Sequence, residues 1–452
     1  MRMLTGDDGV DLWSTQEIWD TALRGMEVVF STHAVLADAL AHGFIQLQQL
    51  ALLVFDEAHH CMKSHPGNQI LQNFYHKLRL QNSEVIIPKI LGLTASIEFK
   101  KIKELERNLN ATCRVPVTYR EELREHVPRR TLTKIEYSNN ASNTKHKSVL
   151  LDRLENTVLM LARDESIPVE LSKMLRKARV IQHQLGEWAA SYFLSHVSRY
   201  AGSQVLQQEN LPSNPQSVLR LSTLIAELMG SCQDAYGEQH TLDSVSSKVH
   251  TLLSLLKEKS RSEFSGIVFV RERVTAYLLS ALVNDHPLTR SLFRCAPFVS
   301  NYARSEIWAT HSSPDFNKKD DVITEFRTGQ RNLLVATNVL EEGIDLPACH
   351  LVISFDTPDN IISYIQRRGR ARQSASEFFI LVADDAKPLA SQHWDDLEIQ
   401  MQNMLSNPQR RSSESGIERE NSLKKVPRLE LPTGFGALSF LLIQLLTPKT
   451  PH

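Results

Sequence analysis

Short apolar runs alternate with helix-like segments over the first hundred residues of the chain. Three of these runs, VVFST, LALLVFDEA and LGLTAS, have the composition of buried strands. Strands that alternate with helices predict a parallel sheet, whose ligands bind beyond the carboxyl ends of the strands. Thr32, Asp56 and Thr94 fall at three such ends. We therefore expect these three residues to face one crevice.

The pattern becomes purely helical between about residues 148 and 260. Leu150, Leu154, Val158 and Leu161 recur at helical spacing, and so do the apolar residues from Val245 to Leu256. Strand-like runs then return in GIVFV, RNLLVATNV, LVISFD and EFFILVAD. This order predicts a helical insertion between two α/β domains, each built on a parallel sheet.

These changes divide the chain into six expected segments. They are a first parallel-sheet domain (1–115), a connector (116–147), a helical insertion (148–260), a second parallel-sheet domain (261–390), a helical arm and polar linker (391–425), and a C-terminal tail (426–452).

The composition places the chain among ordinary globular proteins and argues against disulfide-rich, zinc-binding and membrane-spanning proteins. Of its 452 residues 42% are hydrophobic and 23% are charged, and the net charge is −1. Its five cysteines form no CxxC pair, so neither a zinc site nor a disulfide framework is predicted. No apolar stretch is long enough for a membrane span. We expect no membrane partner and a cytoplasmic location, with the nucleus as the alternative.

Two acidic residues, Asp56 and Glu57, directly follow a buried strand. Carboxylates are costly at such a place unless a cation or a reaction uses them. We expect Asp56 to hold Mg²⁺ through water and Glu57 to orient or deprotonate the attacking water. The alternative is a strand that simply ends in polar residues. His33 and His60 have no ligand partners at usable spacing, so we interpret both as packed or solvated histidines.

Further segments in a fixed order make a family resemblance recognisable. FDEAHHC, LTAS, ATNVLEEGIDLP and YIQRRGRAR resemble motifs II, III, V and VI of superfamily-2 DExD/H helicases. The helical insertion resembles that of the Dicer, viral-RNA-sensor and Hef-like group. Within that group the amino-acid sequence of these segments is most similar to the helicase region of fungal Dicer-like proteins. The resemblance implies two RecA-like domains with ATP and Mg²⁺ bound between them.

The resemblance also implies roles for individual residues. Arg370 and Arg372 resemble the arginines that reach the γ-phosphate, and Gln366 would lie near His59 and the attacking water. The alternative for these arginines is a solvated basic patch. The remaining assignments are Gly343 and Asp345 near the nucleotide ribose, Thr94 and Ser96 in coupling to closure of the cleft, and Thr32 and Thr337 at the nucleic-acid groove. Thr32 could equally satisfy its own backbone.

The expected substrate is double-stranded RNA, which such proteins bind by shape and backbone rather than by sequence. The implied setting is RNA silencing and antiviral defence, with a double-stranded-RNA-binding protein as a candidate partner. Two alternatives stay open. One is a Hef-like helicase acting on DNA junctions, and the other is a catalytically inert RNA-binding module.

The sequence departs from the family in two respects. It contains no GxxxxGK[ST] phosphate-binding loop, so we expect an incomplete first RecA-like domain and little or no ATPase activity from this chain alone. It also contains no ribonuclease III signature, so we expect no RNA cleavage by these residues.

Overall fold

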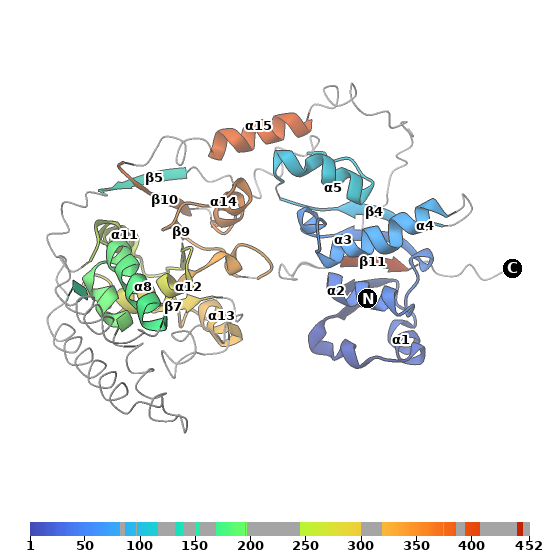
Figure 1. The fold of residues 1–452 in the computed structure, drawn as a ribbon, viewed down its shortest axis with the longest axis horizontal. Helices are drawn as coiled ribbons and strands as arrows, with labels where there is room; N and C mark the ends of the chain where they lie inside the picture. The colour runs from blue at the N-terminus through green and yellow to red at the C-terminus, as the bar shows by residue number, and fades with distance from the viewer. Residues whose placement is uncertain are drawn as a thin grey trace.

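The computed structural model describes residues 1–81, 86–95, 97–115, 132–138, 151–152, 169–194, 196, 245–299, 319–344, 346–373, 375–385, 394–406 and 441–445. They form two α/β domains, drawn on the right and the left of Figure 1. No helix among these residues has the length and apolarity needed to cross a bilayer.

The first domain is built on a five-stranded sheet in the order β1-β2-β11-β3-β4. The first two predicted runs form β2 (Val28–Ser31) and β3 (Leu50–Phe55). The third overlaps β4 (Lys89–Gly92) by two residues, because the observed strand begins earlier and ends before Leu93. β3 runs through the core, where Leu50, Leu53 and Phe55 are completely buried. The sequence pattern missed β1 (Arg2–Leu4), a three-residue edge strand that pairs in parallel with β2.

Strand β11 (Leu441–Leu445) comes from the C-terminal tail and lies in the middle of this sheet (Figure 1). It pairs antiparallel with β2 on one side and with β3 on the other. The other pairs, β1 with β2 and β3 with β4, are parallel. The tail therefore supplies the backbone groups that join β2 to β3, an arrangement that its local pattern did not predict.

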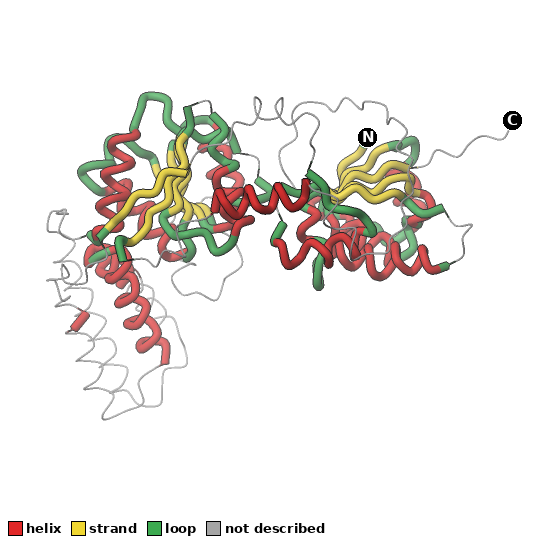
Figure 2. The backbone as a smooth tube through the Cα atoms, turned by 90° about the horizontal axis from the view of Figure 1, so that it is seen from above, coloured by secondary structure: helices red, strands yellow, loops and turns green. Residues whose placement is uncertain are grey.

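Figure 2 shows the strands of the first domain over a layer of helices. The helical segments of this domain are α1 (Gln16–Leu23), α2 (His33–Ala41), α3 (Pro66–Ile70), a π-helical turn (Leu71–Tyr75), α4 (His76–Leu80) and α5 (Ile102–Leu109). Their apolar sides and β3 share one core.

The second domain has a six-stranded, wholly parallel sheet in the order β5-β10-β9-β6-β8-β7. The four predicted runs form its centre: β6 (Gly266–Phe269), β8 (Leu333–Ala336), β9 (Leu351–Ser354) and β10 (Glu377–Ala383). The two strands that the pattern missed are the edges, β5 (Leu132–Tyr137) and β7 (Cys295–Phe298). β5 mixes polar and apolar residues without a continuous apolar run, and β7 contains Pro297, which is tolerated at an edge.

Alternate residues of the central strands enter two separate cores, one on each face of the second sheet. Val268, Val335 and Ile353 pack on one face, whereas their neighbours Ile267 and Leu334 pack on the other. Burial on both faces explains why these strands read as continuous apolar runs.

Helices cover both faces of the second sheet. The first core also contains residues of α8 (Val169–Leu185), α11 (Ser247–Lys259) and α12 (Arg273–Asp285). The described part of the expected helical insertion thus shares a core with the second domain. The other helices are α13 (Lys319–Arg327), α14 (Ile361–Arg368) and α15 (Trp394–Ser406).

The structure shows His33 as a packed histidine, in agreement with our interpretation of the sequence. Its ring stacks on Phe55 with the centroids 5.8 Å apart, and its Nε2 atom is buried without a hydrogen-bond partner. Burial, together with the smaller effects of the neighbouring His65 and His60, lowers its pKa to about 4. The ring is therefore neutral near neutral pH.

We predict that the stability of the first domain falls as the pH drops from about 6.5 to about 4. The pKa of His33 is lower in the folded state, so the unfolded chain takes up this proton first and gains stability relative to the folded chain. The loss attributable to His33 is up to about 3 kcal/mol. It is measured as the difference in unfolding free energy between the wild type and His33→Phe across this range. His42→Phe, at an exposed histidine, is the control. If the unfolding free energies of the wild type and of His33→Phe change equally with pH over this range, the prediction is refuted.

We also predict that Ile443→Pro destabilises the first domain by at least about 1 kcal/mol. Ile443 pairs with Val29 on one side and with Leu53 on the other, and proline cannot donate to a ladder in the middle of a sheet. Denaturant unfolding and amide hydrogen exchange of β2 and β3 measure the effect. Lys449→Pro, outside the described residues, is the matched control. Equal protection of β2 and β3 in the two variants would show that β11 does not hold this sheet together.

Candidate functional site

Two strand ends bring acidic side chains to the boundary between the domains. β3 ends at Phe55 and is followed by Asp56, Glu57 and a 3-10 turn over Ala58–His60. In the second domain, β8 is followed by Thr337, a 3-10 turn over Asn338–Leu340, and then Glu341 and Glu342. The carboxyl ends of these parallel strands therefore supply both halves of the site.

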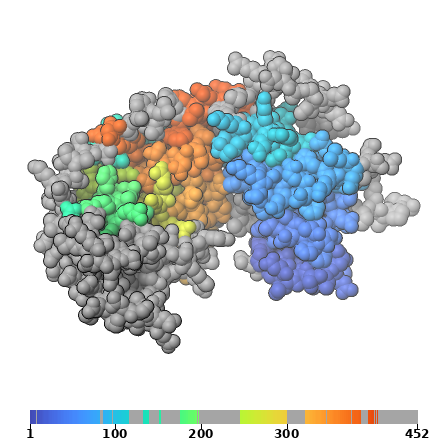
Figure 3. Space-filling model, viewed as in Figure 1, coloured from blue at the N-terminus to red at the C-terminus, as the bar shows by residue number. Residues whose placement is uncertain are grey.

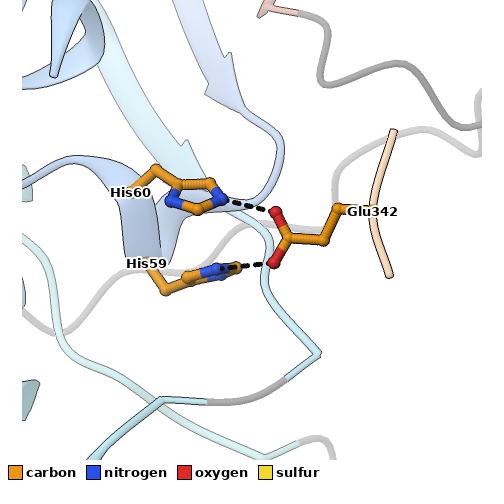
Figure 4. A group of neighbouring side chains, drawn as sticks. All are labelled: His59, His60 and Glu342. Carbon is orange, nitrogen blue, oxygen red and sulfur yellow. Dashed lines mark hydrogen bonds and ion pairs between the residues drawn. The ribbon is translucent and has the colours of Figure 1, made fainter. Parts of the chain in front are cut away.

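Glu342 joins the two domains through two histidines of the first domain and is itself bound by Gln366 of the second. Its Oε1 atom lies 3.2 Å from Nε2 of His59, and its Oε2 atom lies 2.5 Å from Nε2 of His60 (Figure 4). The Gln366 side-chain amide donates to Oε1 of the same carboxylate. The expected proximity of Gln366 to His59 is thus mediated by a glutamate on which no prediction was made.

The charges of this cluster reinforce one another. Burial lowers the pKa of His59, but the carboxylates of Glu342 and Glu57 outweigh burial and raise it to about 9. Burial raises the pKa of Glu342, but hydrogen bonds from His59, His60 and Gln366 outweigh burial and hold it well below its usual range. An ionised carboxylate therefore faces a protonated imidazole across the domain boundary at neutral pH.

His59 is held on its other side by groups of the first domain. Its Nδ1 atom lies 3.0 Å from the Thr94 hydroxyl and 3.2 Å from Oε2 of Glu57. Glu57 adopts the left-handed conformation, with φ 47° and ψ 47°, which turns its side chain back toward His59. A Cβ atom at Gly92 would approach that of Ala58 to 2.9 Å, so the close packing of β4 against this turn requires glycine.

Asp56 is half-buried beside this cluster. Burial raises the pKa of its carboxyl group, and its Oδ1 atom accepts a 3.0 Å hydrogen bond from the Glu57 amide. Oε2 of Glu57 is buried and lacks a well-oriented hydrogen bond. Carboxylate oxygens of this kind are the ligands that Mg²⁺ and its bound water prefer, so the residues present fit that ion.

The arginines of the second domain have different environments. Arg370 is buried, and its guanidinium donates to the Ile344 carbonyl at 2.7 Å and to the Glu341 carbonyl at 3.1 Å. Arg372 is exposed and donates to the Gly369 carbonyl at 2.7 Å. The structure therefore shows Arg370 as a brace for the loop after β8, and Arg372 as the more accessible cation.

The remaining predicted residues lie on turns or outside the described residues. Gly343 has φ 72°, a conformation that favours glycine. Thr337 is buried as the N-cap of its 3-10 turn. Thr32 caps α2 by accepting from the Val35 amide at 3.4 Å, which matches the alternative that it satisfies its own backbone. Ser96 and Asp345 lie outside the described residues.

A second ion pair of the site was missed by the sequence analysis. Arg367 contacts Glu341 at 2.8 Å, and both side chains are buried. The guanidinium also donates to the Asp356 carbonyl and lies 5.2 Å from the Phe269 ring centroid. A sequence signal for this ion pair does exist. Glu341 and Glu342 follow a buried strand and its turn, so the cost of burying a carboxylate, which pointed to Asp56 and Glu57, also applies to them.

Arg368 fastens helix α15 to the second domain. Its guanidinium lies 2.7 Å from the Glu398 carboxylate and 3.1 Å from that of Asp395. Trp394 stacks on Tyr364 with centroids 5.7 Å apart. At the far end of α15, Leu405 packs against the core of the first domain, and Figure 3 shows this orange-red helix along the top of both domains.

We predict that Arg368→Met loosens α15 and destabilises its anchoring by about 3–5 kcal/mol, because Glu398 would keep a buried charge without its cation. Hydrogen exchange over residues 394–406 and thermal unfolding measure this effect. Arg271→Met is the control, since it breaks an exposed pair with Asp359 that contributes little. Equal exchange in the two variants would contradict the anchoring role. Arg368→Met combined with Glu398→Met should recover much of the loss.

Comparison with known proteins supports the interpretation of both domains. Residues 9–105 match the family model of the DEAD/DEAH box helicase, and residues 247–374 match that of the helicase conserved C-terminal domain. The solved helicase domain of Hef from Pyrococcus furiosus is similar at 20% identity and a TM-score of 0.45, over 85% of this chain and 81% of that chain. The two family matches confirm the prediction of two RecA-like α/β domains, of which the second has a wholly parallel sheet and the first a parallel sheet into which antiparallel β11 is inserted.

The chain is also similar to Dicer-like proteins of fungi. It is 36% identical to Dicer-like protein 2-1 of Aspergillus niger, in an alignment that covers 95% of this chain and 33% of the relative. Dicer-like protein 2 of Aspergillus fumigatus is 36% identical, with 88% of this chain and 31% of the relative covered. Dicer-like protein 2 of Neurospora crassa is 33% identical, with 95% and 29% covered. The chain spans about a third of the length of these curated relatives.

Proposed function

We propose that this chain, a Dicer-like helicase region of the DExD/H family, binds double-stranded RNA and couples the binding of ATP and Mg²⁺ to closure of its two RecA-like domains. The observation that carries the proposal is the contact of Glu342 with His59, His60 and Gln366. This contact joins the turn that carries the acidic pair to the second domain. A change in the spacing of the domains would therefore be transmitted to the acidic pair.

Within the proposal the residues of the site have separate tasks. Asp56 holds Mg²⁺ through water, and Glu57 orients or deprotonates the attacking water. His59 links Glu57 and Thr94 of the first domain to Glu342 of the second. Bound ATP would supply the phosphoanhydride bond, and Arg372 is the accessible cation for its γ-phosphate, while Arg370 and Gly343 shape the loop beside it. Asp345 and Ser96 keep their expected roles at the ribose and in coupling.

The proposed nucleic-acid contacts use backbone and small hydroxyl groups. Thr32 and Thr337 each begin a helical turn at a strand end, where free amide groups favour phosphates. Such contacts read the shape of an A-form duplex rather than its sequence. By likeness to the Dicer-like relatives, the proposed setting is RNA silencing and antiviral defence, with a double-stranded-RNA-binding protein as a partner and the cytoplasm as the compartment.

We further propose that ATP hydrolysis by this chain alone is weak. The 452 residues contain no GxxxxGK[ST] loop, whose amides and lysine hold the phosphates in this superfamily. The described carboxylates and arginines can position water and stabilise charge, but they do not replace a phosphate cradle.

The substrate prediction is that the chain binds duplex RNA more tightly than duplex DNA of the same length. Fluorescence anisotropy with matched 30-base-pair duplexes at a fixed salt concentration measures both affinities, because phosphate contacts make binding depend on salt. A clear preference for DNA would instead favour the Hef-like junction helicase.

ATP turnover with and without duplex RNA tests the catalytic part of the proposal. We expect little turnover in either condition, and Glu57→Gln should leave that low rate unchanged. A robust rate that Glu57→Gln abolishes would overturn the expected ATPase deficiency. RNA binding that is unaffected by ATP, together with absent turnover, would favour the inert RNA-binding module.

A further inference from the structure

Three side chains at the domain boundary gather the donor atoms of a metal site. The ligand atoms of His59, His60 and Glu342 lie within 4.8 Å of one another. The two imidazole rings lie side by side, with centroids 4.1 Å apart, and both turn Nε2 toward the carboxylate (Figure 4). The two histidines belong to the first domain and Glu342 to the second.

The donor set suits a borderline divalent ion better than Mg²⁺. Two imidazoles and one carboxylate, with one position left for water, are typical of Zn²⁺, whereas Mg²⁺ prefers oxygen ligands. Metal–ligand bonds of ~2.0–2.1 Å in a tetrahedron separate the ligand atoms by about 3.3 Å. The His59–Glu342 distance of 3.2 Å already fits this spacing.

The pair of His60 and Glu342, 2.5 Å apart, must open slightly to admit an ion. The His60 side chain is 41% exposed, so it has room to move. Exposure on this side also leaves space for a water molecule in the fourth position.

Neighbouring groups hold the ligands as the outer shell of a metal site does. Metal-binding histidines usually place their second ring nitrogen against a carboxylate or another acceptor, which fixes the ring orientation and the tautomer. His59 does this with Glu57 and the Thr94 hydroxyl. Gln366 donates to Glu342, which orients the carboxylate.

We propose that His59, His60 and Glu342 bind one Zn²⁺ ion that links the two domains. Zinc is held by the neutral imidazole, so binding of the ion releases to solvent the proton that His59 carries in the metal-free site. Because the ligands come from both domains, the ion binds only when these are in contact, and its binding free energy stabilises that arrangement. Asp56, where we propose Mg²⁺, is not one of its ligands. The proposed site differs from our interpretation of His60 as a packed or solvated histidine, because its partner Glu342 lies 282 residues away in the sequence.

Three of the four cysteines in the described part of the chain are poor competitors for this ion. Cys61, Cys295 and Cys349 are buried, and burial raises the pKa of each thiol to about 12. Thiolates, which are the zinc ligands, are therefore disfavoured at these positions.

Zn²⁺ binding to the tag-free chain, measured by competition with a chromophoric chelator, tests the proposal. We expect one tight equivalent, weakened at least roughly tenfold by His60→Ala and by the isosteric Glu342→Gln. His250→Ala, at an exposed histidine of α11, should bind like the wild type. Thermal unfolding without metal verifies that each variant is folded.

Small-angle scattering provides a second measurement. Zn²⁺ should reduce the radius of gyration of the wild type but not that of Glu342→Gln. Failure of the wild type to bind, or equal binding by all variants, would overturn the site. Weakening by His60→Ala but not by Glu342→Gln would overturn the link between the domains. Neither measurement uses RNA or ATP, so the outcome is independent of the proposed function.

Discussion

A single carboxylate, that of Glu342, is the contact on which the site depends. It follows β8 of the second domain and meets two imidazoles that follow β3 of the first. The carboxylate is half-buried, so its charge would be costly there without these partners. The partners shift the pKa values of Glu342 and His59 in opposite directions, and both shifts favour the ionised pair. The same contact places Glu57 and Thr94 within reach of the second domain through His59.

Two arginines of the second domain hold the loop that carries Glu342. Arg367 pairs with the adjacent Glu341, and Arg370 donates to carbonyls of the same loop. Arg368 points elsewhere and pairs with Glu398 of α15. The basic run at the end of α14 is therefore not a solvated patch. Arg367 and Arg370 brace the loop after β8, and Arg368 anchors α15. Arg372 is exposed and accessible to an anion.

The first domain depends on a strand that is remote in sequence. β2 and β3 are not paired with each other, and β11 supplies the hydrogen bonds to both. Backbone groups in the middle of a sheet must be paired, because buried amides and carbonyls without partners are strongly unfavourable. The position of Asp56 and Glu57 at the end of β3 thus depends in part on residues near the C-terminus.

The local sequence determined the central elements of both domains. Runs such as LALLVF and LLVA lie in the interior of a sheet, so their apolar continuity identified β3 and β8 directly. The acidic pair after β3 was identified by its cost of burial. Edge strands β1, β5 and β7 gave weaker signals, because an edge needs no continuous apolar run. The tertiary structure alone decided that β11 enters the first sheet, that Glu342 mediates between His59 and Gln366, and that Arg370 is buried. These are contacts between residues far apart in the chain, and periodicity reports only which face of an element is buried, not which distant side chain covers it.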